Sequence, residues 1–413
     1  MKKIAFFNIG CRTNISEIQR WINTLSNDFI IDFGNPDIVV LNTCMVTKNA
    51  ERKSNYKIKT LLKNYPNSKI IVSGCLIDGN GIKDDFKSNK NIILIKNKDK
   101  FTKFYEILGI QNVAYRKKDS IEDFKTRYNI LIQTGCNSKC SYCIIPNLRG
   151  KETSRNINEI LEEVTFVLEN GVKEIILTGT NIARYNYNGY NLVKLVDKIL
   201  NIPLEFRLRI SSIEPWDFNI ELAKLTIEDK RLCPFFHIPI QSGSEKILRL
   251  MRRPFNLDFY KRLIYEIKSI NEKIMLGTDI IVGFPSETKK DFEEIYRFFE
   301  SQPIEHYHVF TYSHRKGSLI FNEMNDNIST EEKKRRLKIL QELGKRKKIN
   351  FIESIKHYEF SFIPEEKHGV YYTGKTENFI DIKVKSNFLR RDNIYYIKIK
   401  DKLEYPFYEA TII

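Results

Sequence analysis

Long hydrophobic runs are missing from this sequence of 413 residues. No stretch approaches the roughly 18 consecutive apolar residues that a membrane-spanning helix needs. The apolar run Ile4–Phe7 is also much shorter than the hydrophobic region of a secretion signal, which takes about 7–15 residues. Hydrophobic residues make up 42% and charged residues 29% of the chain. We therefore expect a globular cytoplasmic protein of two or three domains, with no membrane partner.

Cysteine is scarce, and acidic residues are outnumbered by basic ones. Because the cytoplasm keeps thiols reduced, the seven cysteines are interpreted as metal or cluster ligands rather than as disulfides. The chain has 68 Lys and Arg against 52 Asp and Glu, which leaves a net charge of +16. This excess favours a polyanionic partner, RNA first. In a chain so rich in Lys, Asn and Ile, part of the lysine is equally explained as solubilising filler.

Residues 1–118 alternate between strand and helix patterns. Strands are predicted at Ile4–Ile9, Ile38–Leu41 and Ile70–Val72, and helices at Glu17–Leu25 and Glu51–Asn64. This order predicts a small parallel α/β sheet.

Each of these three strands is followed within a few residues by a cysteine, namely Cys11, Cys44 and Cys75. The carboxyl ends of parallel strands share one edge of a sheet, and binding sites form there. We therefore expect the three cysteines to converge. A single buried cysteine after a strand is usually a packing residue, but the same placement three times is less readily explained in that way.

Strand and helix patterns alternate again over residues 119–352, after a polar stretch at Arg116–Lys125 that is interpreted as a linker. Six βα units predict a partial (β/α)6 barrel, with its chemistry at the C-terminal ends of the strands. The strands are expected at Tyr128–Thr134, Glu174–Thr178, Glu205–Ile210, Phe235–Ile238, Ile274–Val282 and Tyr307–Tyr312, and the helices at Ile157–Glu169, Leu192–Asn201, Ser244–Met251, Leu257–Ile270 and Lys289–Ser301.

The C-terminal region changes character. Glu331–Asn350 has the pattern of a basic helix, and residues 353–413 show the alternation of a small all-β module, at Tyr371–Tyr372, Phe379–Val384 and Ile394–Lys400. The predicted fold class is therefore α/β, with a parallel sheet domain, a central partial barrel and a small β-barrel.

Cys136, Cys140 and Cys143 form a CxxxCxxC pattern directly after a predicted strand. Thiolates are soft ligands that suit iron–sulfur clusters, and a 4Fe-4S cluster takes four ligands. Three cysteines in one loop hold three irons and leave the fourth open to a cofactor. A zinc site is the alternative, but zinc prefers four closed ligands in paired knuckles, and His237 is too distant along the chain for a short finger.

The chain resembles the radical S-adenosylmethionine methylthiotransferases over nearly its whole length. Around the CxxxCxxC loop, the matching segments are Gly135–Cys136, Cys143–Pro146, Arg149–Gly150 and Ser154–Arg155. The three-cysteine N-terminal domain of that family is matched at Gly10–Asn14, Asn42–Thr47 and Ser73–Cys75, and later landmarks at Leu177–Asn181, His237–Ser244 and Gly277–Pro285.

The resemblance implies two 4Fe-4S clusters and S-adenosylmethionine as cofactors. One cluster would be held by Cys136, Cys140 and Cys143 and would generate the radical from S-adenosylmethionine. The other, an auxiliary cluster that carries the sulfur to be methylated, would be held by Cys11, Cys44 and Cys75.

The resemblance also indicates residues for binding S-adenosylmethionine. Tyr142 would pack near it, the segment Gly179, Thr180 and Asn181 would meet its methionine moiety, and Glu214 and Gln241 would reach its ribose or carboxylate. Each of these residues is equally explained as a solvated or capping residue of a loop. No catalytic residue is assigned, and Cys233 is interpreted as a buried free thiol.

Two features favour tRNA as the substrate. The family modifies either adenosines next to the anticodon of tRNA or an aspartate of a ribosomal protein. The positive charge favours RNA, and His368–Gly369 with Gly374–Ile380 resembles the small β-barrel, called TRAM, that binds tRNA in this family. A generic five-stranded barrel is the alternative, because Leu403–Ile413 follows no family pattern.

One motif favours one of the two modified adenosines as the substrate. Asn42–Thr47, followed by Ala50 and Lys53–Ser54, looks more like the enzymes acting on N6-threonylcarbamoyladenosine than like those acting on N6-isopentenyladenosine. A protein of a different class, a non-catalytic iron–sulfur RNA-binding protein or redox sensor, would be free to lose Ile144–Pro146 and Arg149–Gly150, which are intact. An enzyme of this family also needs an electron donor such as flavodoxin or ferredoxin. The oligomeric state stays open.

Overall fold

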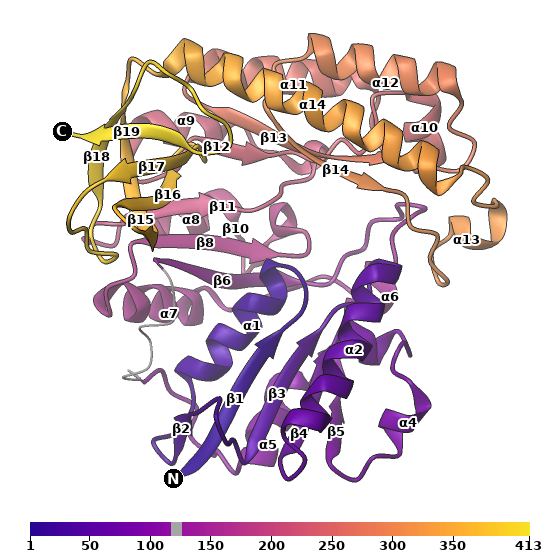
Figure 1. Ribbon diagram of the computed structural model, residues 1–413, viewed down its shortest axis with the longest axis vertical. Coiled ribbons are helices and arrows are strands. Elements are labelled where there is room, and N and C mark those ends of the chain that lie inside the picture. Colours follow the sequence, from indigo (N-terminus) through magenta and orange to yellow (C-terminus); the bar gives the residue numbers. More distant parts are fainter. Residues whose placement is uncertain (117–125) are drawn as a thin grey trace.

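Five parallel strands form the N-terminal sheet, in the order β2-β1-β3-β4-β5 (Figure 1). Their bounds are β1 Lys2–Asn8, β2 Phe29–Ile31, β3 Ile38–Thr43, β4 Lys69–Gly74 and β5 Ile92–Ile95. Apolar side chains of the strands pack on one face against α1 (Arg12–Asn23) and α5 (Lys100–Leu108), and on the other against α2 (Lys48–Asn64). The predicted parallel α/β sheet is confirmed, with two further edge strands. Short helices α3 (Cys75–Asp78) and α4 (Asp84–Lys87) complete this part.

Helix α1 begins at Arg12 rather than at the predicted Glu17. Its first turn is polar, yet Asn14 and Ser16 are buried. The apolar period therefore failed to predict this turn, because Asn14 meets the sheet through hydrogen bonds with Thr43 and Asn42 and not through an apolar side chain.

The computed structural model describes residues 1–116 and 126–413. The predicted linker Arg116–Lys125 lies outside the described residues except for its first residue. No helix among the described residues has the length and apolar character that crossing a membrane requires.

The central part is an incomplete barrel of two parallel sheets. One sheet contains β6 (Arg127–Thr134), β8 (Glu174–Gly179) and β11 (Arg207–Ile210), with the short antiparallel β7 (Thr153–Ser154) at its edge, and the other contains β12 (Phe235–His237), β13 (Met275–Val282) and β14 (His306–Thr311). A parallel bridge from Leu208 to Leu232 links the two sheets. The six main strands therefore follow one another in chain order, as predicted for a partial (β/α)6 barrel.

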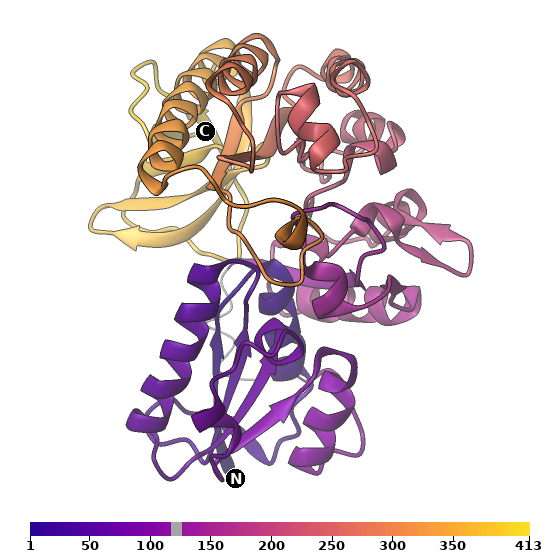
Figure 2. The same ribbon diagram turned by 90° about the vertical axis from the view of Figure 1, so that its right-hand side faces the viewer.

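Helices cover the outside of this barrel (Figures 1 and 2). They are α7 Ile157–Glu169, α8 Leu192–Leu200, α9 Glu221–Glu228, α10 Glu245–Leu250, α11 Leu257–Ile270, α12 Lys289–Ser301 and α14 Thr330–Ile355. Two short helices, α6 Ile145–Arg149 and α13 Ile320–Glu323, lie outside this layer, and α6 lies against the N-terminal part (Figure 1). The longer ones start at side-chain caps: Asn156, Asn191, Asn256 and Thr288 each accept a backbone N–H of the first turn. Helix α9 was not predicted.

A closed five-stranded barrel forms the C-terminal part, in the order β15-β16-β17-β19-β18. Its strands are β15 Glu359–His368, β16 Tyr371–Thr376, β17 Asp381–Lys385, β18 Tyr395–Ile399 and β19 Tyr408–Ile412. The final strand pairs with β17 and β18, so the residues that followed no family pattern are those that close the barrel. The predicted small β-barrel is confirmed.

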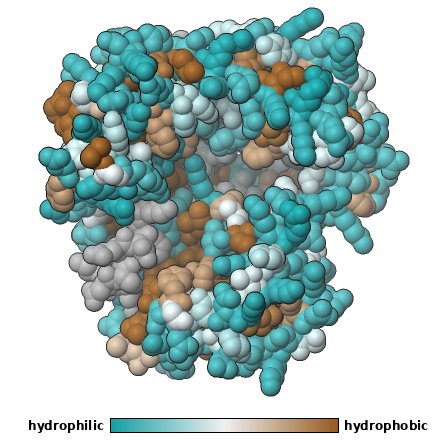
Figure 3. Space-filling model, in the orientation of Figure 1, coloured by the Kyte–Doolittle hydropathy of each residue, from teal (hydrophilic) through white to brown (hydrophobic). Residues whose placement is uncertain are grey.

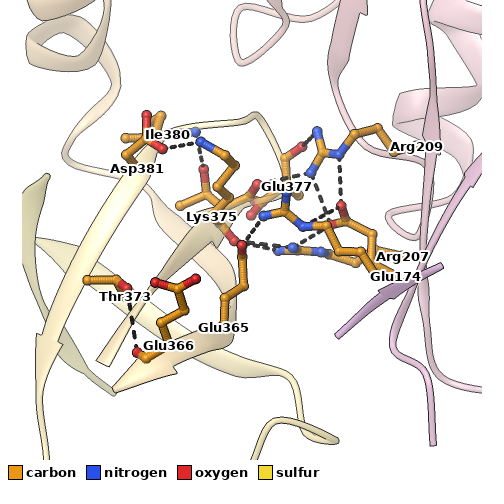
Figure 4. A network of polar contacts seen from close by, with 12 residues as sticks. Glu174, Arg207, Arg209, Glu365, Glu366, Thr373, Lys375, Glu377, Ile380 and Asp381 are labelled. Atoms are coloured by element: carbon orange, nitrogen blue, oxygen red, sulfur yellow. Dashed lines mark hydrogen bonds and ion pairs between the residues drawn. The ribbon is translucent and has the colours of Figure 1, made fainter. Parts of the chain in front are cut away.

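The C-terminal barrel docks on the central barrel through buried charges (Figure 4). Glu174 of β8 is 0% exposed and binds the guanidinium groups of Arg207, at 2.5 Å, and Arg209, at 3.0 Å. Arg207 donates to the carbonyl of Lys375 and Arg209 to that of Glu377. One carboxylate thus holds two arginines that bind the backbone of the neighbouring barrel.

Most of the surface on the side of the molecule seen in Figure 1 is hydrophilic, with scattered hydrophobic residues (Figure 3).

We expect Glu174→Gln to lower the free energy of unfolding by about 3–5 kcal/mol, because removing one partner of a buried ion pair leaves an uncompensated charge. Chemical denaturation of the whole chain measures this change. Glu221→Gln is the control, since Glu221 and its partner Lys224 are half exposed and such surface pairs contribute at most about 1 kcal/mol. Equal effects of the two substitutions would contradict the role of Glu174.

Candidate iron–sulfur and cofactor site

Cys11, Cys44 and Cys75 lie at the carboxyl ends of β1, β3 and β4, which are neighbours in the sheet. Cys44 and Cys75 are buried and Cys11 is exposed. Burial, together with the nearby thiols of Cys75 and Cys11, raises the pKa of Cys44 to about 11. The structure therefore brings the three cysteines together, as the strand-end argument predicted.

A glycine permits this close approach of strands. Gly74 has φ of +101°, and a Cβ atom there would lie 2.3 Å from the carbonyl oxygen of Thr43. Any other side chain at this position would push β4 away from β3.

Buried polar groups lie beside these three cysteines. Glu17 receives Arg149 Nη1 at 2.9 Å on one carboxylate oxygen and Lys100 Nζ at 2.6 Å on the other. Asn42 also donates to Glu17, at 2.7 Å. Burial alone would raise the pKa of Glu17, but the two cations lower it to about 2. Glu17 is therefore a carboxylate at neutral pH.

Cys136, Cys140 and Cys143 lie in the loop that follows β6. All three line a cavity of about 370 Å³, together with Pro146 and Gly150. Burial raises the pKa of Cys140 and, for Cys143, raises it to about 12. The three side chains thus converge on one volume, and a bound metal would have to displace their protons.

Arg253 is a contact of this loop that sequence reasoning missed. Its Nη1 donates to Cys140 Sγ at 3.5 Å, and its Nη2 donates to Glu214 Oε2 at 2.6 Å. The guanidinium also lies 4.5 Å from the ring centroid of Trp216. Arg253 follows a short helix as one of two consecutive arginines, so nothing in the sequence marked it as the buried one. It places Glu214 next to the cysteine loop.

The segment at the end of β8 lies across from the cysteine loop. Gln133 Oε1 accepts the backbone N–H groups of Thr180, at 3.1 Å, and Asn181, at 2.8 Å. Thr180 Oγ1 and Asn181 Oδ1 are buried without a hydrogen-bond partner. Gly179 packs so closely that a Cβ atom would lie 2.5 Å from the carbonyl oxygen of Gln133. Two orphaned polar atoms at a strand end fit the polar groups of a bound cofactor.

Tyr142 and Gln241 line a second cavity, of about 570 Å³. Its wall includes Cys143 of one triad and Val46–Asn49, the segment that follows Cys44 of the other. The remaining lining residues come from β13 and the end of β14: Asp279, Ile281, Phe310, Thr311, Tyr312 and Ser313. This cavity therefore extends from Cys143 to the segment that follows Cys44, and all six expected cofactor-binding residues lie at the carboxyl ends of strands or in the loops that follow.

The donor sets suit iron–sulfur clusters better than single zinc ions. Four sulfurs around one zinc lie about 3.8 Å apart, given a Zn–S distance of about 2.3 Å. Among the described residues, three possible ligand atoms lie within 4.8 Å of one another at His237, Asp279 and His308, a group that contains no cysteine. In this group, the two histidines donate hydrogen bonds to Asp279, at 3.0 and 3.4 Å.

Cys233 lies apart from both triads. It is buried, and burial raises its pKa to about 11, which agrees with the prediction of a buried free thiol.

Comparison with known proteins gives matches over most of the chain. Residues 130–299 match the Radical SAM superfamily, and residues 3–94 match an uncharacterized protein family, UPF0004. The threonylcarbamoyladenosine tRNA methylthiotransferase MtaB of Aquifex aeolicus is 32% identical over 92% of this chain and 96% of its own length. A tRNA-2-methylthio-N(6)-dimethylallyladenosine synthase of Endomicrobium trichonymphae is 33% identical over 88% of each chain.

Solved structures share the fold. The radical S-adenosylmethionine methyltransferase TsrM of Kitasatospora setae, solved with cobalamin and a 4Fe-4S cluster, has a TM-score of 0.56 at 12% identity, over 78% of this chain and 77% of its own. At this identity the likeness concerns the fold alone.

We predict that anaerobically reconstituted protein binds about eight irons, four for each cysteine triad. Replacing Cys136, Cys140 and Cys143 with alanine should leave about half of this iron, and replacing Cys233 with alanine should leave all of it. Iron and sulfide assays measure both. A triple variant without iron, or a wild-type protein with only half the expected content, would show that the chain has one site.

Proposed function

Because this chain belongs to the radical S-adenosylmethionine methylthiotransferases of tRNA, we propose that it adds a methylthio group to N6-threonylcarbamoyladenosine next to the anticodon. Membership implies S-adenosylmethionine and a 4Fe-4S cluster. The second cluster, the tRNA partner and a cytoplasmic location are part of the proposal. The observation that carries it is the cavity lined both by Cys143 of one triad and by Val46–Asn49, the segment that follows Cys44 of the other, since sulfur and radical must meet at one base.

The three parts of the chain have separate roles in this proposal. Residues 1–118 hold the auxiliary cluster through Cys11, Cys44 and Cys75; residues 119–352 hold the radical-generating cluster through Cys136, Cys140 and Cys143; residues 353–413 bind tRNA. When bound, these groups supply a 5′-deoxyadenosyl radical and a methylated sulfur. An electron donor such as flavodoxin or ferredoxin supplies the electron.

The protein residues orient the reactants. Thr180 and Asn181 offer their orphaned oxygens to the methionine end of the cofactor, and Arg253 keeps Glu214 at the position facing its ribose. Tyr142 and Gln241 form the cavity wall. The apolar side chains of Ile281, Phe310 and Tyr312 on the opposite wall limit water around the target base.

The charge in the cavity favours a threonylcarbamoyl group over an isopentenyl group. A threonylcarbamoyl group carries a carboxylate and a hydroxyl, whereas an isopentenyl group is a hydrocarbon. Lys48 lines the cavity, and its ammonium has no acidic partner among the described residues. Asp279, the acidic residue of the wall, is already bound by His237 and His308. The cavity therefore has a cation available for the substrate carboxylate.

The proposed tRNA surface includes only part of the basic helix α14. Lys333, Arg336 and Lys348 are buried and bind Asp326, Glu287 and Asp381. The exposed basic residues of α14 are Lys334, Arg335, Lys338, Lys345 and Arg346. Arg335 and Arg346 pair with Glu332 and Glu300, so Lys334, Lys338 and Lys345, with the C-terminal barrel, are available for phosphates.

Other substrates remain as alternatives within the same chemistry. They are N6-isopentenyladenosine of tRNA and an aspartate of a ribosomal protein. A non-catalytic iron–sulfur RNA-binding protein or redox sensor is the alternative of a different class, but it would have no use for a cavity lined by Cys143 and by the segment that follows Cys44.

We expect Lys48→Met to slow methylthiolation of an anticodon stem-loop carrying N6-threonylcarbamoyladenosine by roughly 10- to 150-fold. A hydrogen bond to a charged group contributes about 1.5–3 kcal/mol, and each 1.4 kcal/mol is a factor of about ten. Mass spectrometry of the digested RNA measures the product. Lys59→Met, an exposed site on the same helix, is the matched control.

Two outcomes would contradict this account. If the wild-type protein modifies only the stem-loop with N6-isopentenyladenosine, the proposed substrate is wrong. If Lys48→Met and Lys59→Met act equally fast on the threonylcarbamoyl RNA, Lys48 does not bind its carboxylate.

A further inference from the structure

Arg149 reaches from one cysteine triad to the other. It ends helix α6, six residues after Cys143 in the loop of the radical-generating site. Its guanidinium, however, lies within the N-terminal part, where Nη1 binds Glu17 at 2.9 Å and Nη2 donates to Asn14 Oδ1 at 3.1 Å. The Arg149 side chain is only 3% exposed. The central part therefore supplies a buried cation to the other part.

This cation lies beside the auxiliary triad. Asn14 Oδ1, which accepts from Arg149, also accepts from Cys11 Sγ at 3.3 Å. Arg149 is also a charged neighbour of the other two thiols, those of Cys44 and Cys75. Its charge therefore acts on the whole triad.

The local charges do not cancel. Arg149 and Lys100 each contribute one positive charge, and Glu17 contributes one negative charge, so their sum is +1. Both oxygens of Glu17 are occupied by these two cations. The triad therefore faces a buried excess of one positive charge.

Docking of α6 is what delivers this charge. Leu148 packs in the hydrophobic cluster formed by β3, β4 and α2, and its carbonyl accepts from Asn97 Nδ2 at 2.9 Å. Arg149 is the next residue. The helix that follows Cys143 is therefore fixed against the N-terminal part, and Arg149 cannot leave the auxiliary site without α6.

We propose that the positive charge of Arg149, which is supplied by the helix that follows Cys143, raises the reduction potential of the auxiliary cluster. This inference rests on the two-cluster part of the proposed function. A cluster becomes more negative when it accepts an electron, and a nearby cation stabilises the more negative state. Because the surroundings exclude water, screening is weak. The auxiliary cluster thus has its full potential only when the two parts are docked.

The test is an anaerobic redox titration of the reconstituted full-length protein, followed by electron paramagnetic resonance. The auxiliary signal is the one that persists when Cys136, Cys140 and Cys143 are replaced by alanine. We expect Arg149→Met to shift the potential of this signal downward. The double variant Arg149→Met/Glu17→Gln restores the local charge of +1 through Lys100 and should return the potential close to that of wild type. Lys98→Met, at an exposed nearby site, should leave it unchanged.

Each result is decisive. An unshifted potential in Arg149→Met, or equal shifts in the single and double variants, overturns the inference. If Arg149→Met fails to load the auxiliary iron and the double variant loads it, the charge role is supported; if neither loads, it is overturned. A wild-type protein without any auxiliary signal refutes the two-cluster proposal itself, which is a separate failure.

Discussion

A buried ion pair between Arg149 and Glu17 holds the two cysteine triads in one arrangement. The triads sit at the carboxyl edges of two different parallel sheets, and nothing in either sheet alone would make these edges face each other. The pair connects the loop of Cys143 to the helix that starts after Cys11. Glu17 would be costly to bury without its two cations, so the N-terminal part favours the docked state, in which one cavity is lined by Cys143 and by the segment that follows Cys44.

The other end of the central barrel is closed in a similar way. Arg207 and Arg209, held by Glu174, donate to carbonyl groups of the C-terminal barrel, and Phe379 of that barrel stacks on Phe235 of β12 with ring centroids 4.6 Å apart. This end is sealed by the barrel that is proposed to bind tRNA. A base that approaches Cys143 therefore enters at the opposite end, through the cavity that Lys48 and Ser313 help to line.

Most of the framework was predictable from the sequence. The apolar periods predicted α7, α11 and α12 with the bounds observed, because these helices pack one clear stripe on the barrel. The convergence of Cys11, Cys44 and Cys75 was predictable because the carboxyl ends of parallel strands share one edge of a sheet. Buried charges were not predictable: Glu17, Lys100 and Arg253 have the sequence pattern of exposed residues, and only tertiary contacts give them partners.

Helix α14 illustrates the same limit. Leu340, Leu343 and Ile355 are buried along one face of this helix, and Arg336 is buried on the same face. The sequence contains this helical spacing of buried residues, but the many basic residues of the segment suggested an exposed helix. Closure of the C-terminal barrel by β19 could likewise not be predicted from the sequence, because it depends on pairing with β17 and β18.

The central proposal is that sulfur and radical meet on the threonylcarbamoyl base of tRNA, in the cavity lined by Cys143 and by the segment that follows Cys44. Nucleoside mass spectrometry of tRNA from cells lacking this protein tests it directly. The account predicts that 2-methylthio-N6-threonylcarbamoyladenosine disappears and N6-threonylcarbamoyladenosine accumulates, and that the wild-type gene, but not Cys44→Ala, reverses both changes. Unchanged tRNA nucleosides, or loss of the methylthio group from N6-isopentenyladenosine instead, would contradict it.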